Sequence, residues 1–325
     1  MKNLLRFLVI FSFFSVAFTS EKLFAQREIS TGIEEIVVTA QKREENLQDV
    51  PASVSAMDAA TLEKTFARDL MDVAGVSPNL IIDPILGNGT AAISIRGVQM
   101  NDVEKSFDPA VAVYQDGIYL ATATGALLNT WDAERIEVLR GPQGTMFGRN
   151  TIGGLVHVIR SKPTGEFGGK VNMTAAEDQQ KDIKVMINFP SMLNDTLATK
   201  FTAMKLDGGG YFNNPTRGGN EGDIDVEAYS FSALWDPTEN LSIQLTYDDI
   251  NDQTDVRPVS CFTTAPELFA LVGQPVATEC NGGDNLGFHR TVFQETEQAA
   301  SVEIEAITLN IEYDINENNK LILVY

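Results

Sequence analysis

Cysteines and histidines are the side chains best suited to chemistry here, and this 325-residue chain has only two of each. Cys261 and Cys280 both lie in the stretch Asn251–Glu297, together with His289. In an exported chain such a pair favours a disulfide bond, which would stiffen the loop and, in the chain-entropy model, contribute about 3 kcal/mol to stability. A metal site with His289 is the alternative, but further ligands at suitable spacing are lacking. His157 lies in an alternating strand pattern and is expected to be structural or to face a pore.

No Ser/His/Asp arrangement and no paired acidic motif stands out, so we predict no catalytic residue, no metal site and no cofactor. The balance of charge excludes another class of function. The chain has 45 acidic and 24 basic residues and a net charge of -21. Binding to nucleic acid requires basic patches that neutralise phosphates, so nucleic acid is not an expected partner.

The predicted elements of the chain are arranged around one stretch, Glu134–Pro163. Two short strand patterns, Arg135–Leu139 and Leu155–Ile159, flank a loop rich in glycine. Glycine tolerates positive φ and lets other backbone approach closely, so we expect this loop to be packed rather than solvated. It is not a nucleotide-binding loop, because neither G-x-G-x-x-G nor G-x-x-x-x-G-K-[ST] is present.

In this stretch a strand, Leu-Arg-Gly-Pro, Phe-Gly-Arg-Asn and Gly-Gly-x-Val follow one another without gaps. This order closely resembles the end of the plug domain of TonB-dependent outer-membrane receptors. The resemblance implies an α+β plug domain inside an antiparallel transmembrane β-barrel, which has 22 strands in the family. It also implies that Arg96 and Arg140 meet glutamates on the inner barrel wall and hold the plug there. Two solvated arginines at strand ends are the alternative.

A short β-branched run lies between Gln26–Gly32 and the charged Lys42–Glu45. An isolated strand has unpaired backbone groups, so it is suited to joining the sheet edge of another protein. The run resembles the family's TonB box, the peptide that pairs with the energy-transducing protein TonB. The alternative is an ordinary first strand of the plug. The predicted box consists of Glu35, Ile36, Val37, Val38, Thr39 and Ala40.

The N-terminus has the features of a secretory signal peptide. Lys2 and Arg6 precede the apolar run Phe7–Phe18, and a small residue, Ala25, precedes the expected cleavage point. This run is too short to span a bilayer, although a retained anchor is the alternative. The domains expected are a signal peptide at 1–25, an extension with the box at 26–46, a plug at 47–163, and barrel strands at 164–325.

After Pro163 the pattern changes to long segments in which apolar and polar residues alternate. Such alternation puts one face of a strand in lipid and the other toward a polar lumen, although a soluble β-sandwich gives the same local signal. Alternating short and long connections favour the barrel, and Tyr229, Trp235 and Tyr247 suit aromatic girdles. The seven strands expected lie near 167–176, 182–190, 196–206, 227–236, 240–250, 298–313 and 320–325.

Seven strands are about a third of the 22 in the family barrel, so we expect an incomplete sequence or a fragment. The alternative is that Tyr325 is the terminal aromatic of a true barrel end. Asp223, Asp225 and Glu227 lie on one side of an extended run. They lack the glycine and spacing of a calcium loop, so a solvated acidic loop is favoured. Contact with lipopolysaccharide through divalent ions is the alternative.

The function that the resemblance implies is energised uptake of a scarce solute across the outer membrane of a Gram-negative cell. Extracellular loops and the plug apex would bind the solute, and TonB would remodel the plug through the box. A ferric siderophore is the leading ligand; cobalamin, haem, nickel complexes and oligosaccharides are alternatives. Outer-membrane lipid and lipopolysaccharide would surround the barrel. An exported soluble β-rich binding or adhesion protein is the competing class.

Overall fold

The computed structural model of the chain describes residues 37–40, 42–43, 45–65, 67, 69–75, 77–84, 91–99, 108–121, 131–215, 217–255, 301–316 and 319–325. Short strands and helices make up its first part, and a sheet of long strands makes up the rest. None of the helices among these residues is long and apolar enough to cross a membrane.

The first part alternates short strands with short helices, as expected for an α+β plug. Five of its strands form one sheet in the order β3-β8-β9-β6-β7, in which only β6 and β9 are parallel. Two further pairs, β1–β2 and β4–β5, are antiparallel. The helices are α2 (Ala59–Lys64), α3 (Leu70–Ala74) and α4 (Gly144–Phe147). The strands are β1 (Val37–Val38), β2 (Glu45–Asn46), β3 (Val54–Asp58), β4 (Leu80–Pro84), β5 (Ala91–Ile95), β6 (Val111–Gln115), β7 (Ile118–Leu120), β8 (Ala133–Arg140) and β9 (Gly154–Arg160).

Local sequence signals explain where several of these elements begin and turn. Asp58 and Asp69 cap α2 and α3, and each carboxylate accepts a main-chain N–H of the first helical turn at 2.8 Å. Asp116 and Gly117, at φ 48° and 85°, form the two-residue turn between β6 and β7. Both positions require the left-handed region, which is why a two-residue Asp-Gly sequence predicts this kind of hairpin.

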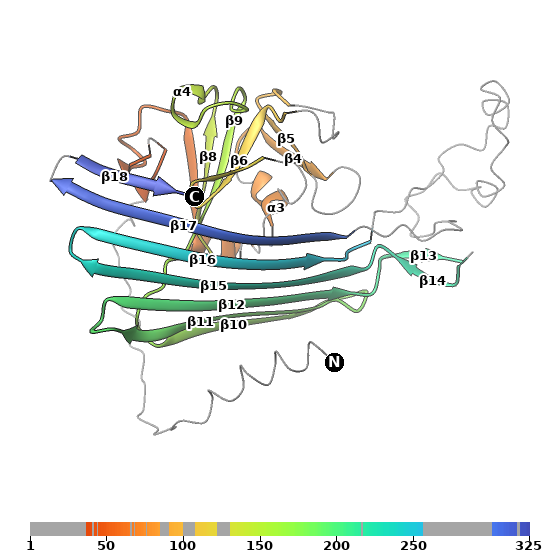
Figure 1. The fold of residues 1–325 in the computed structure, drawn as a ribbon. Helices are drawn as coiled ribbons and strands as arrows, with labels where there is room; N and C mark the ends of the chain where they lie inside the picture. The colour runs from red at the N-terminus through yellow and green to blue at the C-terminus, as the bar shows by residue number, and fades with distance from the viewer. Residues whose placement is uncertain are drawn as a thin grey trace. The chain divides into compact units, whose positions relative to one another are not determined.

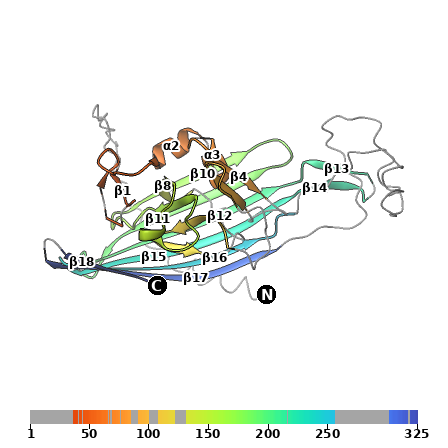
Figure 2. The same cartoon turned by 90° about the horizontal axis from the view of Figure 1, so that it is seen from above.

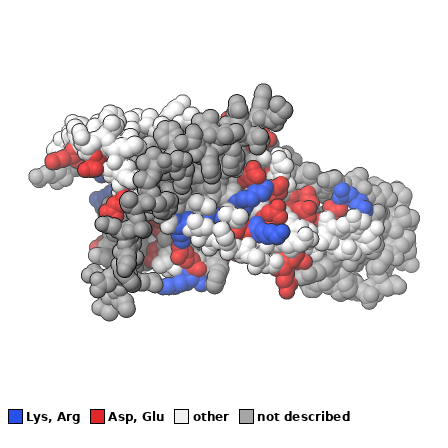
Figure 3. Space-filling model, turned by 90° about the horizontal axis from the view of Figure 1, so that it is seen from below, with Lys and Arg blue, Asp and Glu red and all other residues white. Residues whose placement is uncertain are grey.

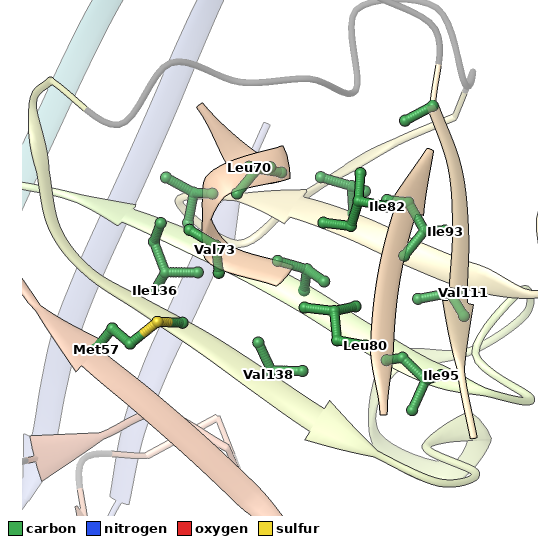
Figure 4. Close-up of a cluster of buried hydrophobic side chains, with 14 of the residues drawn as sticks. Met57, Leu70, Val73, Leu80, Ile82, Ile93, Ile95, Val111, Ile136 and Val138 are labelled. Carbon is green, nitrogen blue, oxygen red and sulfur yellow. The ribbon is translucent and has the colours of Figure 1, made fainter. Parts of the chain in front are cut away.

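The main core of the plug lies on one face of the five-stranded sheet, under α3 and the β4–β5 pair (Figure 4). Leu70, Ile95 and Ile136 are fully buried there. Burying each such side chain stabilises the fold by about 1.5–3 kcal/mol relative to leaving it exposed. The residues labelled in Figure 4 are Met57, Leu70, Val73, Leu80, Ile82, Ile93, Ile95, Val111, Ile136 and Val138.

A second, smaller cluster lies on the opposite face of the same sheet. It contains alternate residues of β6, β8 and β9, whose neighbours point into the main core. The chain segment around β1 contributes Val38 and Ala40 to this cluster. The N-terminal segment therefore covers the second face of the plug sheet.

The second part of the chain is a seven-stranded antiparallel sheet, which we call the wall. Its strands follow one another in chain order and lie side by side in Figures 1 and 2. The number, order and approximate positions of the strands confirm the prediction, and among the described residues the two end strands of the sheet, β10 and β18, do not pair with each other. The strands are β10 (Gly168–Ala175), β11 (Lys181–Met192), β12 (Leu197–Gly208), β15 (Ile224–Thr238), β16 (Leu241–Asp252), β17 (Val302–Asn316) and β18 (Asn319–Val324).

The connection between β12 and β15 is long, as predicted for residues 207–226. It contains a small hairpin that the prediction did not include, formed by β13 (Phe212–Asn214) and β14 (Gly219–Glu221). In addition, β15 already begins at Ile224, because its first residues pair with the end of β12. Each strand of this hairpin is only three residues long, which is too short to leave a periodic signal in the sequence.

The two faces of the wall differ in polarity. Phe231, Trp235 and Tyr247 point outward and each is more than 40 % exposed, whereas Ser232 and Thr246 on the inner face are buried. An apolar face of this extent suits contact with lipid and would be a liability on a soluble β-sandwich. Toward the long connections the outward positions become charged, as expected at the edge of an apolar band. The charged outward residues there include Lys205, Glu227, Asp249 and Glu305.

Candidate coupling segment and plug contacts

The predicted TonB box falls partly within the structure. Glu35 and Ile36 lie outside the described residues, and Val37 and Val38 form β1, which pairs with β2. Val37 is 42 % exposed, whereas Val38 is fully buried in the second cluster. The segment is therefore folded onto the plug in this structure, through a ladder only two residues long. Such a short ladder has few hydrogen bonds to break when the segment leaves the plug.

A fully buried carboxylate, Glu137 on β8, ties this segment to the plug. Its Oε1 accepts the main-chain N–H of Thr39 at 2.8 Å, and the Thr39 hydroxyl lies 3.1 and 3.2 Å from the two carboxylate oxygens. Arg135 donates from Nε to the same Oε1 at 2.9 Å, which supplies the cation that a buried carboxylate needs. One side chain of the sheet thus anchors the N-terminal segment by several charge-assisted hydrogen bonds.

Arg96 and Arg140 lie together beside Ser53. The guanidinium of Arg96 donates to the Ser53 hydroxyl at 3.2 Å, and the main-chain N–H of Arg140 donates to the Ser53 carbonyl at 2.9 Å. Within the described residues neither guanidinium has a carboxylate within 4.0 Å, and Nε of Arg140 is buried without a partner. The structure brings these two predicted residues together; their contact with barrel glutamates stays a prediction.

The glycines after Arg140 allow backbone to pack closely, as the sequence predicts. Gly154 has φ +137°, and a Cβ atom there would collide with the main-chain oxygen of Leu139. A Cβ atom on Gly153 would lie 2.9 Å from the side chain of Val111. Strands β8, β9 and β6 can therefore approach one another only because these two positions carry no side chain.

His157 is buried in β9, in agreement with a structural histidine. Its Nε2 accepts the main-chain N–H of Gly117 at 3.0 Å and so supports the β6–β7 turn. Burial lowers the pKa of His157, and the nearby carboxylates of Glu137 and Asp116 oppose that shift. The imidazole is therefore neutral at physiological pH and acts as a hydrogen-bond acceptor.

The remaining predicted residues lie elsewhere. Cys261, Cys280 and His289 are outside the described residues, so the disulfide stays a prediction. Asp225 and Glu227 belong to β15 rather than to a loop, and both form ion pairs with Lys205 on β12. On the face drawn in Figure 3, basic side chains lie among acidic ones and do not gather into a basic patch.

The sequence interpretation missed three charged residues that make long-range contacts, namely Glu137, Arg160 and Lys200. A signal for Glu137 exists, because it is the charged residue between Ile136 and Val138 in a strand buried on both faces. Arg160 and Lys200 have no comparable signal. A charged residue at the polar parity of an alternating strand is expected to face water, whatever it contacts in the fold.

Comparison with known proteins supports the assignment of a plug domain to this sequence. Residues 46–155 match the profile of the family described as TonB-dependent Receptor Plug Domain. The chain is 30 % identical over 161 residues to the vitamin B12 transporter BtuB of Vibrio vulnificus, covering 48 % of this chain and 25 % of that protein. It is also 30 % identical over 168 residues to the iron-regulated outer membrane virulence protein of Vibrio cholerae, covering 50 % and 25 %. The match thus spans a quarter of each of these two relatives.

A solved structure shares the fold of both parts of the chain. The ferric yersiniabactin uptake receptor FyuA from Yersinia pestis superimposes with a TM-score of 0.70 and 18 % identity, covering 84 % of this chain and 40 % of that chain. At this identity the likeness concerns the fold alone. Together, the plug profile over residues 46–155, the outer-membrane relatives and the shared fold support a TonB-dependent receptor located in the outer membrane.

Proposed function

We propose that the protein takes part in TonB-dependent uptake of a scarce solute across the outer membrane, with Glu35–Ala40 as the segment that TonB engages. The observation that carries this proposal is the short strand β1, which stands just ahead of the plug domain. It offers a peptide of extended conformation that has only a two-residue ladder of its own. A second protein can replace such a ladder by adding its own strand edge.

Burial of the segment suggests how this step proceeds. Val37 is the exposed residue of β1, so an approaching strand meets it first. Val38 and Ala40 leave the second cluster only after the bonds between Thr39 and Glu137 break. Pulling on the segment then acts directly on β8, a central strand of the plug sheet. No covalent chemistry is part of this proposal.

We assign domain limits to this function as a signal peptide at 1–25, the extension with the box at 26–46, the plug at 47–163 and barrel wall at 164–325. The last boundary is supported by the change of sheet, because β9 belongs to the plug sheet and β10 to the wall. The outward face of the wall would meet outer-membrane lipid, and its charged rim would meet the lipopolysaccharide headgroups. Solute would contact the plug and the long connections of the wall.

A substitution at Val37 tests the coupling segment. Val37→Pro removes a main-chain donor and restricts φ, so pairing with an added strand should fail while the solute still binds at the cell surface. Val37→Thr keeps the donor and the β-branched shape, and serves as the matched control. Uptake and surface binding of a radiolabelled solute are measured in the same cells. Loss of both activities, or of neither, in the proline variant would contradict the assignment.

Ferric siderophore is the solute that we propose first. Two of the three relatives compared above carry iron in their names, an iron-regulated outer membrane protein and a ferric yersiniabactin uptake receptor. The third is a vitamin B12 transporter, which makes cobalamin the specific alternative. Growth of a receptor-deleted strain complemented with the gene would be measured with ferric siderophores or with cobalamin as the limiting nutrient. Restoration by cobalamin alone would replace the iron proposal.

A further inference from the structure

The last strand of the plug contacts the wall through a buried arginine. Arg160, at the end of β9, donates from Nε to Asp116 at 2.6 Å and from Nη1 to Asp248 at 2.7 Å. All three side chains are less than one fifth exposed. Asp116 belongs to the β6–β7 turn, whereas Asp248 points from the inner face of β16. The guanidinium therefore joins two elements of the plug to one strand of the wall.

A buried lysine makes the reciprocal contact. Lys200, on the inner face of β12, is 3 % exposed. Its ammonium lies 2.8 and 2.7 Å from the two carboxylate oxygens of Asp132, and it also contacts the carbonyl and the hydroxyl of Ser161. Asp132 stands just before β8 and Ser161 just after β9, and the two are themselves hydrogen-bonded. This cation comes from the wall, and its acceptors come from the plug.

The other ion pairs between plug and wall in the described residues are more exposed. Lys162 lies 3.8 Å from Glu312 and is half exposed, and Lys170 and Glu63 are 39 % and 58 % exposed. Exposed pairs contribute little, because water and salt screen them and two long side chains must be ordered. In a buried pair, removal of one partner leaves an uncompensated charge, which is strongly destabilising. Among these ion pairs, those of Arg160 and Lys200 therefore contribute most to holding the plug against the wall.

The Arg160 and Lys200 contacts are also close together along the plug chain. Arg160 and Ser161 are consecutive, so both contacts act where the chain leaves the plug for the wall. They reach β16 and β12, the two strands on either side of β15. Burial by itself lowers the pKa of Arg160, but the carboxylates of Asp116 and Asp248 raise it above its ordinary value. The arginine therefore stays charged in its buried position.

We propose that Arg160–Asp248 and Lys200–Asp132 form a fixed seat for the plug, distinct from the Arg96 and Arg140 pair. The seat positions β9 and the β6–β7 turn against the wall. It does not depend on TonB or on the solute. The point where the chain leaves the plug consequently resists displacement, while the N-terminal segment leaves once its two-residue ladder and its hydrogen bonds to Glu137 are broken.

Asp248→Asn is the first test, because it removes the charge at nearly constant shape. Hydrogen exchange is followed in the membrane-embedded protein, without TonB or solute, together with entry of the large antibiotic vancomycin into cells. Exchange in 111–120 and 154–161 should accelerate about tenfold or more, with measurable entry of vancomycin. Asp248→Glu keeps the charge and should restore most of the protection. Ser232→Ala is the matched control, because this buried hydroxyl bonds within the wall, to Thr246 at 3.0 Å.

Lys200→Met provides an independent variant of similar side-chain length. It should accelerate exchange in 131–136 and 158–161, at the other half of the seat. Unchanged exchange in the plug for both variants would overturn the proposal. So would equal acceleration in β15–β17, since that pattern indicates a damaged wall rather than a loosened plug. If Asp248→Asn does not reach the membrane, the Asp248→Glu and Lys200→Met variants decide between the same outcomes.

Discussion

Thr39→Val should release the N-terminal segment from the plug without unfolding the plug. Valine has nearly the shape of threonine, so the substitution removes the hydroxyl and little else. The lost contact is the one from Thr39 Oγ1 to the buried carboxylate of Glu137, at 3.1 and 3.2 Å. The main-chain hydrogen bond from Thr39 to Glu137, at 2.8 Å, and the ion pair of Glu137 with Arg135 remain.

The size of the effect follows from the number of bonds lost. A hydroxyl has one proton, so it donates to one carboxylate oxygen at a time although it lies near both. A hydrogen bond to a charged group contributes about 1.5–3 kcal/mol. Because 1.4 kcal/mol is a factor of ten in an equilibrium constant, the released fraction should rise by about 10- to 150-fold. The main core, including Ile136 and Val138, is not touched by this change.

A spin label at Val37→Cys measures the release, since this position is 42 % exposed and accepts a label without repacking. The mobile component of its spectrum should grow in the Thr39→Val background, and amide exchange of 37–40 should accelerate in parallel. Thr65→Val is the matched control, because its hydroxyl bonds only to main-chain oxygens of its own helical turn, at 2.9 and 3.2 Å. A spectrum identical to that of the unsubstituted protein, or an equal change in the control, would refute the role of this hydrogen bond.

Three further predictions concern the plug as a whole. Gly154→Ala should destabilise the plug by several kcal/mol, about 3 or more, because it combines strain at φ +137° with a collision against a main-chain carbonyl of β8. Gly144→Ala, with open space at its Cβ, should leave the melting temperature nearly unchanged, and equal melting of the two variants would contradict the reasoning. Because burial lowers the pKa of His157, the unfolded chain takes up a proton first, so stability should decline as pH falls below about 6.5 and through the lowered folded pKa. Denaturant midpoints from pH 8 to 5 should show a weaker decline for His157→Gln, and an unaltered slope would exclude the histidine as the cause. Arg96→Ala combined with Arg140→Ala should admit large antibiotics and accelerate exchange in 141–154, and an impermeable cell with unchanged exchange would show that this pair does not hold the plug.

Regular alternation made the wall predictable from sequence. In Leu241–Tyr247 the apolar residues share one parity, and the observed strand β16 places that parity outward. Short connections forced neighbouring strands to pair, so order and register followed from the same pattern. Turn chemistry was equally local, since Asp116-Gly117 adopts the left-handed pair of φ values that this dipeptide favours.

The contacts of charged residues were decided by tertiary structure. Alternation assigns a side chain to a face, but it does not state which distant group that face will meet. Lys200 and Asp248 have the parity of lumen-facing residues, and only the position of the plug turns them into buried partners of Asp132 and Arg160. The same holds for Glu137, whose partner Thr39 lies 98 positions earlier in the chain.

For the N-terminal segment, too, the sequence predicts the local conformation but not the partner. Its sequence predicts an extended, β-branched peptide able to pair with a strand edge, and β1 is such a peptide. Which edge it pairs with depends on the free-energy difference between competing partners, here β2 and Glu137 on one side and a second protein on the other. The sequence determines the local conformation, because backbone preference is set by neighbouring residues. The tertiary structure determines the partner, because burial and ion pairing depend on groups that are distant in the chain.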